Sequence, residues 1–218
     1  MTSRFIWDVG DIEIEKPHVI VKKGGEGSGD FGHAGRPGEV GGSSSHSVHV
    51  DRKKKIKIET ELREFENAEV IYDAPMEMAK IVDPEGNVVL EKKGDGVSVS
   101  FSDAEVSKMK DCILTHNHPT DYTFSRQDLS AAKYMDLQEM RATCKSGTYI
   151  MRRPKNGWDS VDKSTVEDII REEAYKDMDY RKSQGMEAWI TDTGVIMNNT
   201  WKRWCKDNNV EYIYVPRR

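Results

Sequence analysis

The stretch CILTHNHPTDYTFSRQDLSAAKYM, residues 112 to 135, sets the centre of the expected fold. Its first seven residues pass from apolar to polar, which is typical of a buried strand that emerges at the edge of a sheet. Ser125 and Asp128 then have the spacing of a capping box, and we expect a helix from Ser125 to Met140. A buried strand, a polar loop and a helix in this order predict a sheet with helices packed against it.

The residues before this stretch predict a hairpin. Residues 77 to 82 (EMAKIV) have a strand pattern, and residues 83 to 86 (DPEG) carry the residues that a type I turn prefers. Residues 87 to 93 follow as the return strand. The other expected elements are a strand at 97–101, a helix at 103–110 opened by a Ser102–Glu105 capping box, a strand at 147–154, helices at 161–182 and 192–207, and a strand at 211–216. This mixture of helices and strands predicts an α/β or α+β fold.

The N-terminal region has a different character. Residues 3 to 22 hold short β-like runs, so we assign 1–23 to a short N-terminal β-like segment. Residues 24 to 46 hold nine glycines and no apolar periodicity, and they lack the Gly-Lys-Ser/Thr of a phosphate-binding loop. Such a stretch cannot bury enough surface to offset the entropy lost on ordering. We therefore expect a flexible Gly/Ser-rich linker over 24–50.

A basic run, DRKKKIKI, covers residues 51 to 58. It is typical of a solvated charge run that leads into a domain, although a nucleic-acid or address signal has the same composition. The pattern of residues 59 to 68 fits a short helix and an extended lead-in equally well.

Composition restricts the class of protein. The net charge of −5 argues against a nucleic-acid partner, which would favour a basic chain. No stretch approaches the roughly 20 apolar residues of a membrane span, and the N-terminus has no signal pattern, so we expect a cytoplasmic protein without a membrane partner. The three cysteines are far apart and form no CxxC, which predicts reduced core residues.

The two histidines of the central stretch are candidate metal ligands. On a strand, residues i and i+2 point to the same face, so His116 and His118 project side by side about 7 Å apart along the backbone. Asp128, at the first turn of the next helix, supplies a third ligand, and zinc bound to His, His and Asp keeps a fourth position for water. A solvated HNHP loop next to an ordinary capping box remains the alternative.

The pattern His116-x-His118-Pro119 followed by Ser125-x-x-Asp128 resembles the signature of the JAMM (JAB/MPN-type) metalloproteases. The string THNHPTDYTFSRQDL is similar to the RadC branch, and more so to JAB-type domains of phage and polymorphic-toxin proteins, in which an acidic residue leads into a strand that ends in Asp-x-x-Gly. Glu77 and the sequence Asp83-Pro-Glu-Gly86 match that feature. The resemblance covers residues 77 to 154, about a third of the chain, and implies a JAB/MPN-like mixed sheet flanked by helices.

The resemblance also implies roles for the matching residues. His116, His118 and Asp128 hold Zn2+, Glu77 is the general base, and Ser125 donates a hydrogen bond to the oxyanion. Thr115 and Asn117 are weaker candidates for residues that support the ligands. The implied reaction is hydrolysis of a peptide or isopeptide bond in a protein or peptide substrate, such as a ubiquitin-like conjugate or a phage head protein.

The linker has its own resemblance. Its Gly-His-x-Gly-Arg-Pro-Gly string is similar to sequences between modules of phage head-morphogenesis and effector proteins, which implies a phage or prophage origin and a place in the host cytoplasm or the virion. We assign residues 51–158 to a metallohydrolase domain and 159–218 to a helical C-terminal extension packed on it. Two alternatives remain: a head-associated structural protein that uses this fold as a scaffold, and a RadC-like DNA-related protein.

Overall fold

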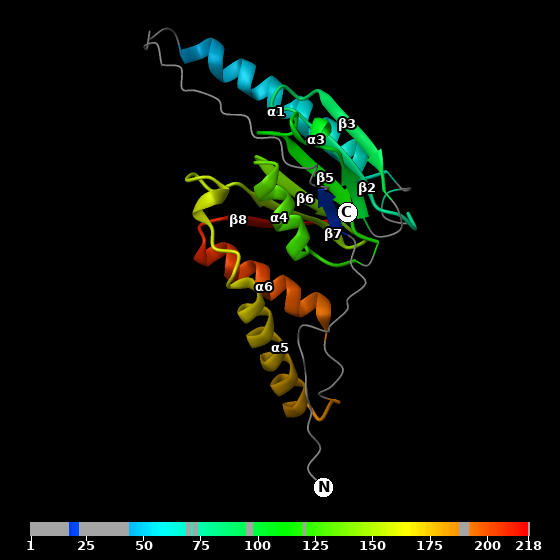
Figure 1. Cartoon of the computed structure of the whole chain (residues 1–218), viewed down its shortest axis with the longest axis vertical. Helices are drawn as coiled ribbons and strands as arrows, with labels where there is room; N and C mark the ends of the chain where they lie inside the picture. The colour runs from blue at the N-terminus through cyan, green and yellow to red at the C-terminus, as the bar shows by residue number, and fades with distance from the viewer. Residues whose placement is uncertain are drawn as a thin grey trace.

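The computed structural model describes residues 18–21, 44–68, 71, 74–94, 98–119, 121–187 and 192–217. In this part of the chain, six strands form a main sheet in the order β3-β2-β5-β6-β7-β8, and β1 pairs with β4 in a separate parallel sheet (Figure 1). The strands are β1 His18–Val21, β2 Met78–Val82, β3 Val88–Lys93, β4 Ser98–Phe101, β5 Ile113–Asn117, β6 Glu139–Thr143, β7 Gly147–Arg152 and β8 Glu211–Pro216. The helices are α1 Ser44–Glu66, α3 Asp103–Val106, α4 Arg126–Tyr134, α5 Val166–Ser183 and α6 Thr193–Asp207, with a 3-10 turn at Trp158–Ser160.

The main sheet is mixed, because β5 and β6 run parallel while the other neighbouring pairs are antiparallel. Helices pack against it, so the expected mixed sheet flanked by helices is confirmed. The predicted hairpin is also confirmed as β2 and β3. Their turn is closed by a hydrogen bond from the Gly86 N–H to the Asp83 carbonyl, and Gly86 has a φ of 80°, which glycine tolerates well.

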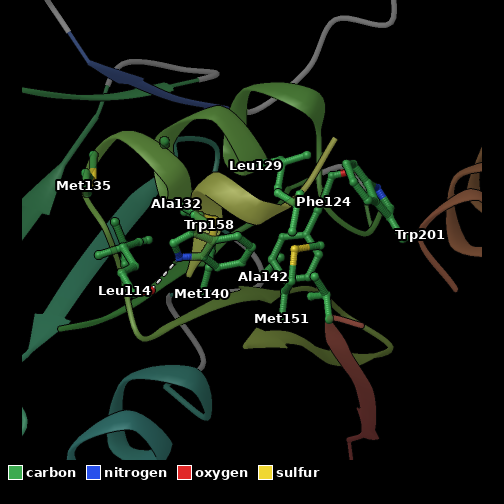
Figure 2. Packing of buried hydrophobic residues seen from close by; sticks show 14 of the residues in the cluster. Leu114, Phe124, Leu129, Ala132, Met135, Met140, Ala142, Met151, Trp158 and Trp201 are labelled. Carbon is green, nitrogen blue, oxygen red and sulfur yellow. Dashed lines mark hydrogen bonds between the residues drawn. The ribbon is translucent and has the colours of Figure 1, made fainter. Parts of the chain in front are cut away.

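Each face of the sheet has its own cover. Alternate residues of a strand point to opposite faces, so Ile113 packs on one side with Leu62 of α1, while Leu114 packs on the other. The second side holds the larger core, to which α4 contributes Leu129 and α6 contributes Trp201 (Figure 2). The candidate ligands His116 and Asp128 belong to β5 and α4, the elements that meet in this larger core.

The end of α4 corrects one prediction. We expected a helix to Met140, but α4 ends at Tyr134, and Glu139 and Met140 belong to strand β6. The chain leaves the helix at Asp136, whose φ of 49° is left-handed, and the Leu137 N–H donates to the Ala132 carbonyl across the helix end. This is the hydrogen-bond pattern of a Schellman motif with Asp in the position usually held by Gly, so the sequence lacks the usual stop signal.

The N-terminal boundary of the domain also differs from the prediction. Residues 44 to 50, which we placed in the linker, form the start of α1, and the basic run at 51–58 continues the same helix. Residues 59 to 66 are therefore helical rather than extended. Helical spacing places Ile58, Leu62 and Phe65 on one face of α1, where they pack against the core. The rest of the predicted linker lies outside the described residues, as do residues 1–17 of the β-like segment.

Two other helices are shorter than predicted. The capping box of Ser102 and Glu105 opens α3 as expected, but this helix spans Asp103–Val106 rather than 103–110. Helix α5 begins at Val166, five residues after the predicted start, because Val161, which follows the 3-10 turn at Trp158–Ser160, has an extended backbone with φ −96° and ψ 137°. Figure 1 shows α5 packed along α6 and extending away from the sheet.

The C-terminal part contributes to the sheet as well as covering it. Strand β8 pairs with β7 over all six residues, from Glu211–Arg152 to Pro216–Gly147. Trp201 and Trp204 of α6 are fully buried, as expected for core residues. The prediction for Trp189 lies outside the described residues.

The cysteine prediction is confirmed. All three cysteines are free and buried. Burial raises the pKa of the Cys112 thiol to about 11 and that of Cys205 to about 12, so the reactive thiolate form is scarce at neutral pH. Among the described residues, no helix combines the length and apolar character that crossing a bilayer requires.

Candidate metal centre

Three elements bring the predicted ligands together. Strands β2 and β5 are paired so that Ala79 lies opposite His116. When this antiparallel register is continued by two residues, Glu77 lies opposite His118, and alternation places both on the face of His116. Helix α4 packs on the same face and carries Asp128 in its first turn. Residues that are far apart in the sequence therefore converge at one end of the sheet.

The distances suit a single small cation. The two histidine Nε2 atoms are 2.9 Å apart, and the Asp128 carboxylate oxygens lie 3.3 Å from the Nε2 of His116 and 3.4 Å from that of His118. Zinc–nitrogen and zinc–oxygen bonds of about 2.0–2.2 Å in a tetrahedral arrangement separate two ligand atoms by about 3.3–3.5 Å. The predicted set of His116, His118 and Asp128 thus has nearly the spacing that one zinc ion requires.

Glu77 is also within reach of this position. Its Oε1 lies 3.7 Å from the Nε2 of His116, and one donor atom each from Glu77, His116 and His118 all lie within 4.8 Å of one another. The cluster therefore offers two carboxylates next to the histidine pair, Glu77 and Asp128. Distances alone permit either carboxylate to be the third ligand, and the variants described below distinguish the two arrangements.

The hydrogen bond of His118 orients its ring for metal binding. Its Nδ1 lies 2.9 Å from the Tyr122 carbonyl, which can only accept, so Nδ1 carries the proton. In the neutral ring, Nε2 then presents a lone pair towards His116 and Asp128. Lone pairs that converge at this distance require a proton or a cation between them, and a histidine fixed through its other nitrogen is the usual arrangement in metal sites.

Burial makes the cluster chemically unusual. Glu77, His116 and Asp128 are 0% exposed, and His118 is 2% exposed. Burial lowers the pKa of His116, whereas the nearby Asp128 carboxylate raises it. Burial also disfavours the ionised form of Asp128, but the two histidines hold its pKa well below the ordinary value. A neutral His116 and an ionised Asp128 are the forms that bind a metal ion.

Ser125 fixes Asp128 in place. Its backbone N–H and its Oγ donate hydrogen bonds of 2.6 and 2.9 Å to Oδ2 of Asp128, and the Asp128 N–H donates to Ser125 Oγ at 3.2 Å. The predicted capping box is therefore confirmed, and it leaves Asp128 Oδ1 directed at His116. The role of Ser125 as an oxyanion donor stays a prediction, and it would require the hydroxyl to turn away from Asp128.

Of the two weaker candidates, Thr115 and Asn117, only Asn117 contacts the backbone next to a cluster residue. Thr115 donates from Oγ1 to Glu66 of α1 at 3.1 Å, on the face of β5 opposite the histidines, so the structure does not bring it to the cluster. The Asn117 side chain accepts from the Met78 N–H and donates to the Met76 carbonyl, at 2.6 and 3.2 Å. Asn117 thus contacts the backbone on both sides of Glu77.

Sequence reasoning missed the residues that hold the loop between His118 and Ser125. The His118 N–H donates to the Thr143 carbonyl of β6 at 2.7 Å. The Trp201 indole of α6 donates to the Phe124 carbonyl at 2.5 Å, and the hydroxyls of Thr123 and Tyr212 are 2.8 Å apart. No local pattern signals these contacts, because the partners are separated from the loop by 25 residues or more along the chain.

Comparisons with known proteins do not assign this chain to a family. No protein-family model, no curated protein and no solved structure matches the chain. The similarity to the JAMM metalloproteases therefore remains a resemblance carried by five residues, and their geometry carries the functional argument.

The first prediction concerns metal content. Protein purified without chelator should carry about one zinc per chain, as measured by elemental analysis, and should take zinc up again after chelation. His116→Ala and Asp128→Ala should each lose this zinc, because each removes a donor within 3.4 Å of its neighbour. Thr115→Val on the same strand is the matched control and should keep it. Protein that stays metal-free after exposure to zinc would exclude the site.

The second prediction concerns the capping box. Ser125→Ala removes the hydroxyl that bonds to both the carboxylate and the N–H of Asp128, so the variant should lose about 1 kcal/mol of unfolding free energy. It should also bind zinc more weakly, by about 10- to 100-fold, as for other residues that orient a ligand. Ser102→Ala removes the equivalent cap of α3, whose capping-box bonds join Ser102 to Glu105, and should leave zinc affinity unchanged. Equal zinc affinity in the two variants would contradict the proposed orientation of Asp128.

Proposed function

We propose that this chain is a zinc-dependent hydrolase of the JAMM type that cleaves a peptide or isopeptide bond. The observation that carries the proposal is the convergence of His116, His118, Asp128 and Glu77 in one buried cluster with spacings suited to one cation. Two carboxylates beside a histidine pair supply both a ligand and a proton acceptor. The JAMM-type motif that these residues form supports the same reaction.

His116, His118 and Asp128 would hold the ion. Bound zinc would act as a Lewis acid and lower the pKa of water from about 15.7 to about 7. Glu77, whose Oε1 lies 3.7 Å from His116 Nε2, would accept a proton from the attacking water and return it to the leaving amine. The Ser125 hydroxyl would stabilise the oxyanion after turning from Asp128. The buried surroundings strengthen these charge interactions, because little water remains to screen them.

The same burial favours a second candidate. All five motif residues, Glu77, His116, His118, Ser125 and Asp128, are at most 4% exposed. A large substrate cannot contact so enclosed a cluster unless part of its cover moves. A structural metal centre in a scaffold protein needs no such access, and closed ligand sets are typical of structural zinc. The two candidates differ in whether any bond is hydrolysed.

Hydrolysis that depends on the metal would separate these candidates. The chelated protein and the zinc-restored protein would each be incubated with a mixed-sequence peptide library and with ubiquitin-like conjugates, and products identified by mass spectrometry. We expect cleavage by the zinc-restored protein alone. If zinc restores folding stability but no substrate is cleaved in either set, the structural metal centre becomes the better description. Cleavage that persists in His116→Ala would exclude the proposed site.

A further inference from the structure

The ladder between β2 and β5 stops just before Glu77. The paired residues run from Val82–Ile113 to Ala79–His116, and Met78 would be the next partner of Asn117. At that position, however, the Met78 N–H donates to the side-chain Oδ1 of Asn117. A side-chain amide thus takes over from the backbone ladder at the point where the strand reaches the metal centre.

The amide of Asn117 uses both of its ends. Oδ1 accepts from the Met78 N–H at 2.6 Å, and Nδ2 donates to the Met76 carbonyl at 3.2 Å. The residue enclosed between these two bonds is Glu77. The Asn117 side chain is 0% exposed, so water does not compete for either bond. Buried hydrogen bonds of this kind define one geometry, because an unpaired partner would cost about 1–3 kcal/mol.

The opposite side of Glu77 is held as well. Its carbonyl accepts from the Gly94 N–H at 2.7 Å. A side chain at Gly94 would bring its Cβ to 1.9 Å from the Ser98 carbonyl oxygen and 3.1 Å from that of Glu77, so only glycine fits here. The backbone around Glu77 is therefore fixed by three hydrogen bonds. Gly94 bonds to the Glu77 carbonyl, and Asn117 bonds to the neighbouring residues Met76 and Met78.

We propose that Asn117 is a positioning residue for the carboxylate of Glu77. The proposal rests on the proposed function, in which Glu77 transfers a proton beside the ion. Without the amide, the Met78 N–H and the Met76 carbonyl would lose these two bonds. The end of β2 would then be held only from the β3 side, by the Met78–Lys93 pair and Gly94, and would fray more readily. A general base has to be held within about 0.5 Å of its productive position. Asn117, the residue between the two histidines, therefore has a positioning role, although its side chain is not one of the proposed metal ligands.

A double-mutant cycle tests this inference. Asn117→Ala should retain zinc and lower kcat by about 10- to 100-fold with KM unchanged, as for residues that support a functional group from outside. In a Glu77→Gln background, the same change should lower kcat less than twofold, because Asn117 acts through Glu77. Equal losses in both backgrounds would overturn the proposal. If Glu77→Gln alone cleaves as fast as the unmodified protein, the proposed function fails instead, so the two failures are distinct.

Asn208→Ala is a matched control. The Asn208 amide also accepts from one backbone N–H, of Asp162 at 2.9 Å, and donates to one carbonyl, of Trp204 at 3.0 Å, but it lies at the end of α6. The control should lose less stability than Asn117→Ala, because Asn208 is only partly buried, and it should keep kcat. A matching loss of kcat in this variant would show that the Asn117 effect is only structural.

A spectroscopic measurement makes the test independent of hydrolysis. Protein loaded with Co2+ has a visible spectrum that reports the surroundings of the ion. Asn117→Ala should change this spectrum in the same direction as Glu77→Gln and should add no change to Glu77→Gln. A spectrum equal to that of the unmodified protein would overturn the proposal. Asn117→Ser, which keeps a small hydrogen-bonding group, replaces Asn117→Ala in every measurement if the alanine variant does not fold.

Discussion

Replacing Glu77 by glutamine should abolish most hydrolysis while leaving zinc in place. Glutamine keeps the size and hydrogen-bonding capacity of the side chain but cannot accept a proton at neutral pH. The expected loss in kcat is about 10²–10⁴-fold, which is the usual contribution of a positioned general base. Because the donor atoms of His116, His118 and Asp128 lie within 3.4 Å of one another, zinc binding should survive the change.

The outcome also decides which carboxylate is the third ligand. If Glu77→Gln loses zinc as completely as Asp128→Ala does, Glu77 is a ligand and the general-base assignment is wrong. Zinc content would be measured by elemental analysis, and kcat with the substrate found in the peptide or conjugate screen. Glu91→Gln, on the edge strand β3, removes a half-exposed strand carboxylate that pairs with Lys80 and should change neither quantity.

Replacing Arg141 by methionine should cost more stability than the other substitutions considered above. Arg141 lies in β6 on the face covered by α1, with its side chain 4% exposed. It donates to Glu59 of α1 at 2.7 Å, lies 3.4 Å from Glu66 of the same helix, and pairs closely with Glu139. Removing Arg141 takes the cation away from the buried Glu66, which keeps only its hydrogen bond from Thr115, whereas Glu139 keeps Arg152 as a partner. We therefore expect a loss of about 3–5 kcal/mol in the free energy of unfolding by urea.

The pH dependence of this loss provides a second check. Burial raises the pKa of Glu66, and Arg141 partly counteracts that rise. Without Arg141 the pKa of Glu66 should rise further. A carboxyl whose pKa is raised on folding contributes stability that is fully present below its unfolded pKa and is lost as the pH rises through the folded pKa. The deficit of Arg141→Met should therefore be larger at pH 7 than at mildly acidic pH.

Arg171→Met is the control for the network. Arg171 pairs with Asp168 on α5, and both side chains are about half exposed or more. Solvent screens such a pair, so its removal should cost about 0–1 kcal/mol. A loss in Arg141→Met no larger than in Arg171→Met would mean that water enters the network. In that case the attachment of α1 to the sheet depends on Leu62 and Phe65 instead.

Local sequence was sufficient to predict the turns and helix starts whose stabilising hydrogen bonds join residues close together in the chain. In the β2–β3 turn, Asp83 Oδ1 accepts from the backbone N–H groups of Glu85 and Asn87, and this carboxylate identified the turn in advance. The capping boxes at Ser102 and Ser125 were predicted for the same reason, since each joins residues three positions apart. The pairing of His116 and His118 on one face follows from the two-residue period of a strand.

Tertiary contacts decided the elements that the sequence misassigned. The continuation of α4 to Met140 was a reasonable local inference, because residues 136 to 140 include no glycine or proline. The helix stops because Asp136 adopts a left-handed conformation, which Arg153 stabilises by donating to its carbonyl and its carboxylate at 3.0 and 2.9 Å. Arg153 is 17 residues away, beyond the range of any local pattern.

The same division applies to the candidate metal centre. The sequence by itself determined which residue types are available, because a His-x-His pair on a strand and an aspartate in the next capping box are local patterns. The resemblance had named Glu77, but its approach to these residues depends on the pairing of β2 with β5, which only the tertiary structure shows. The hydrogen bonds of Asn117 to Met76 and Met78 depend on the same pairing, since they join residues 41 and 39 positions apart. Contacts of this kind depend on the register of strands, and register is set by the packing of the whole sheet rather than by any short stretch of sequence.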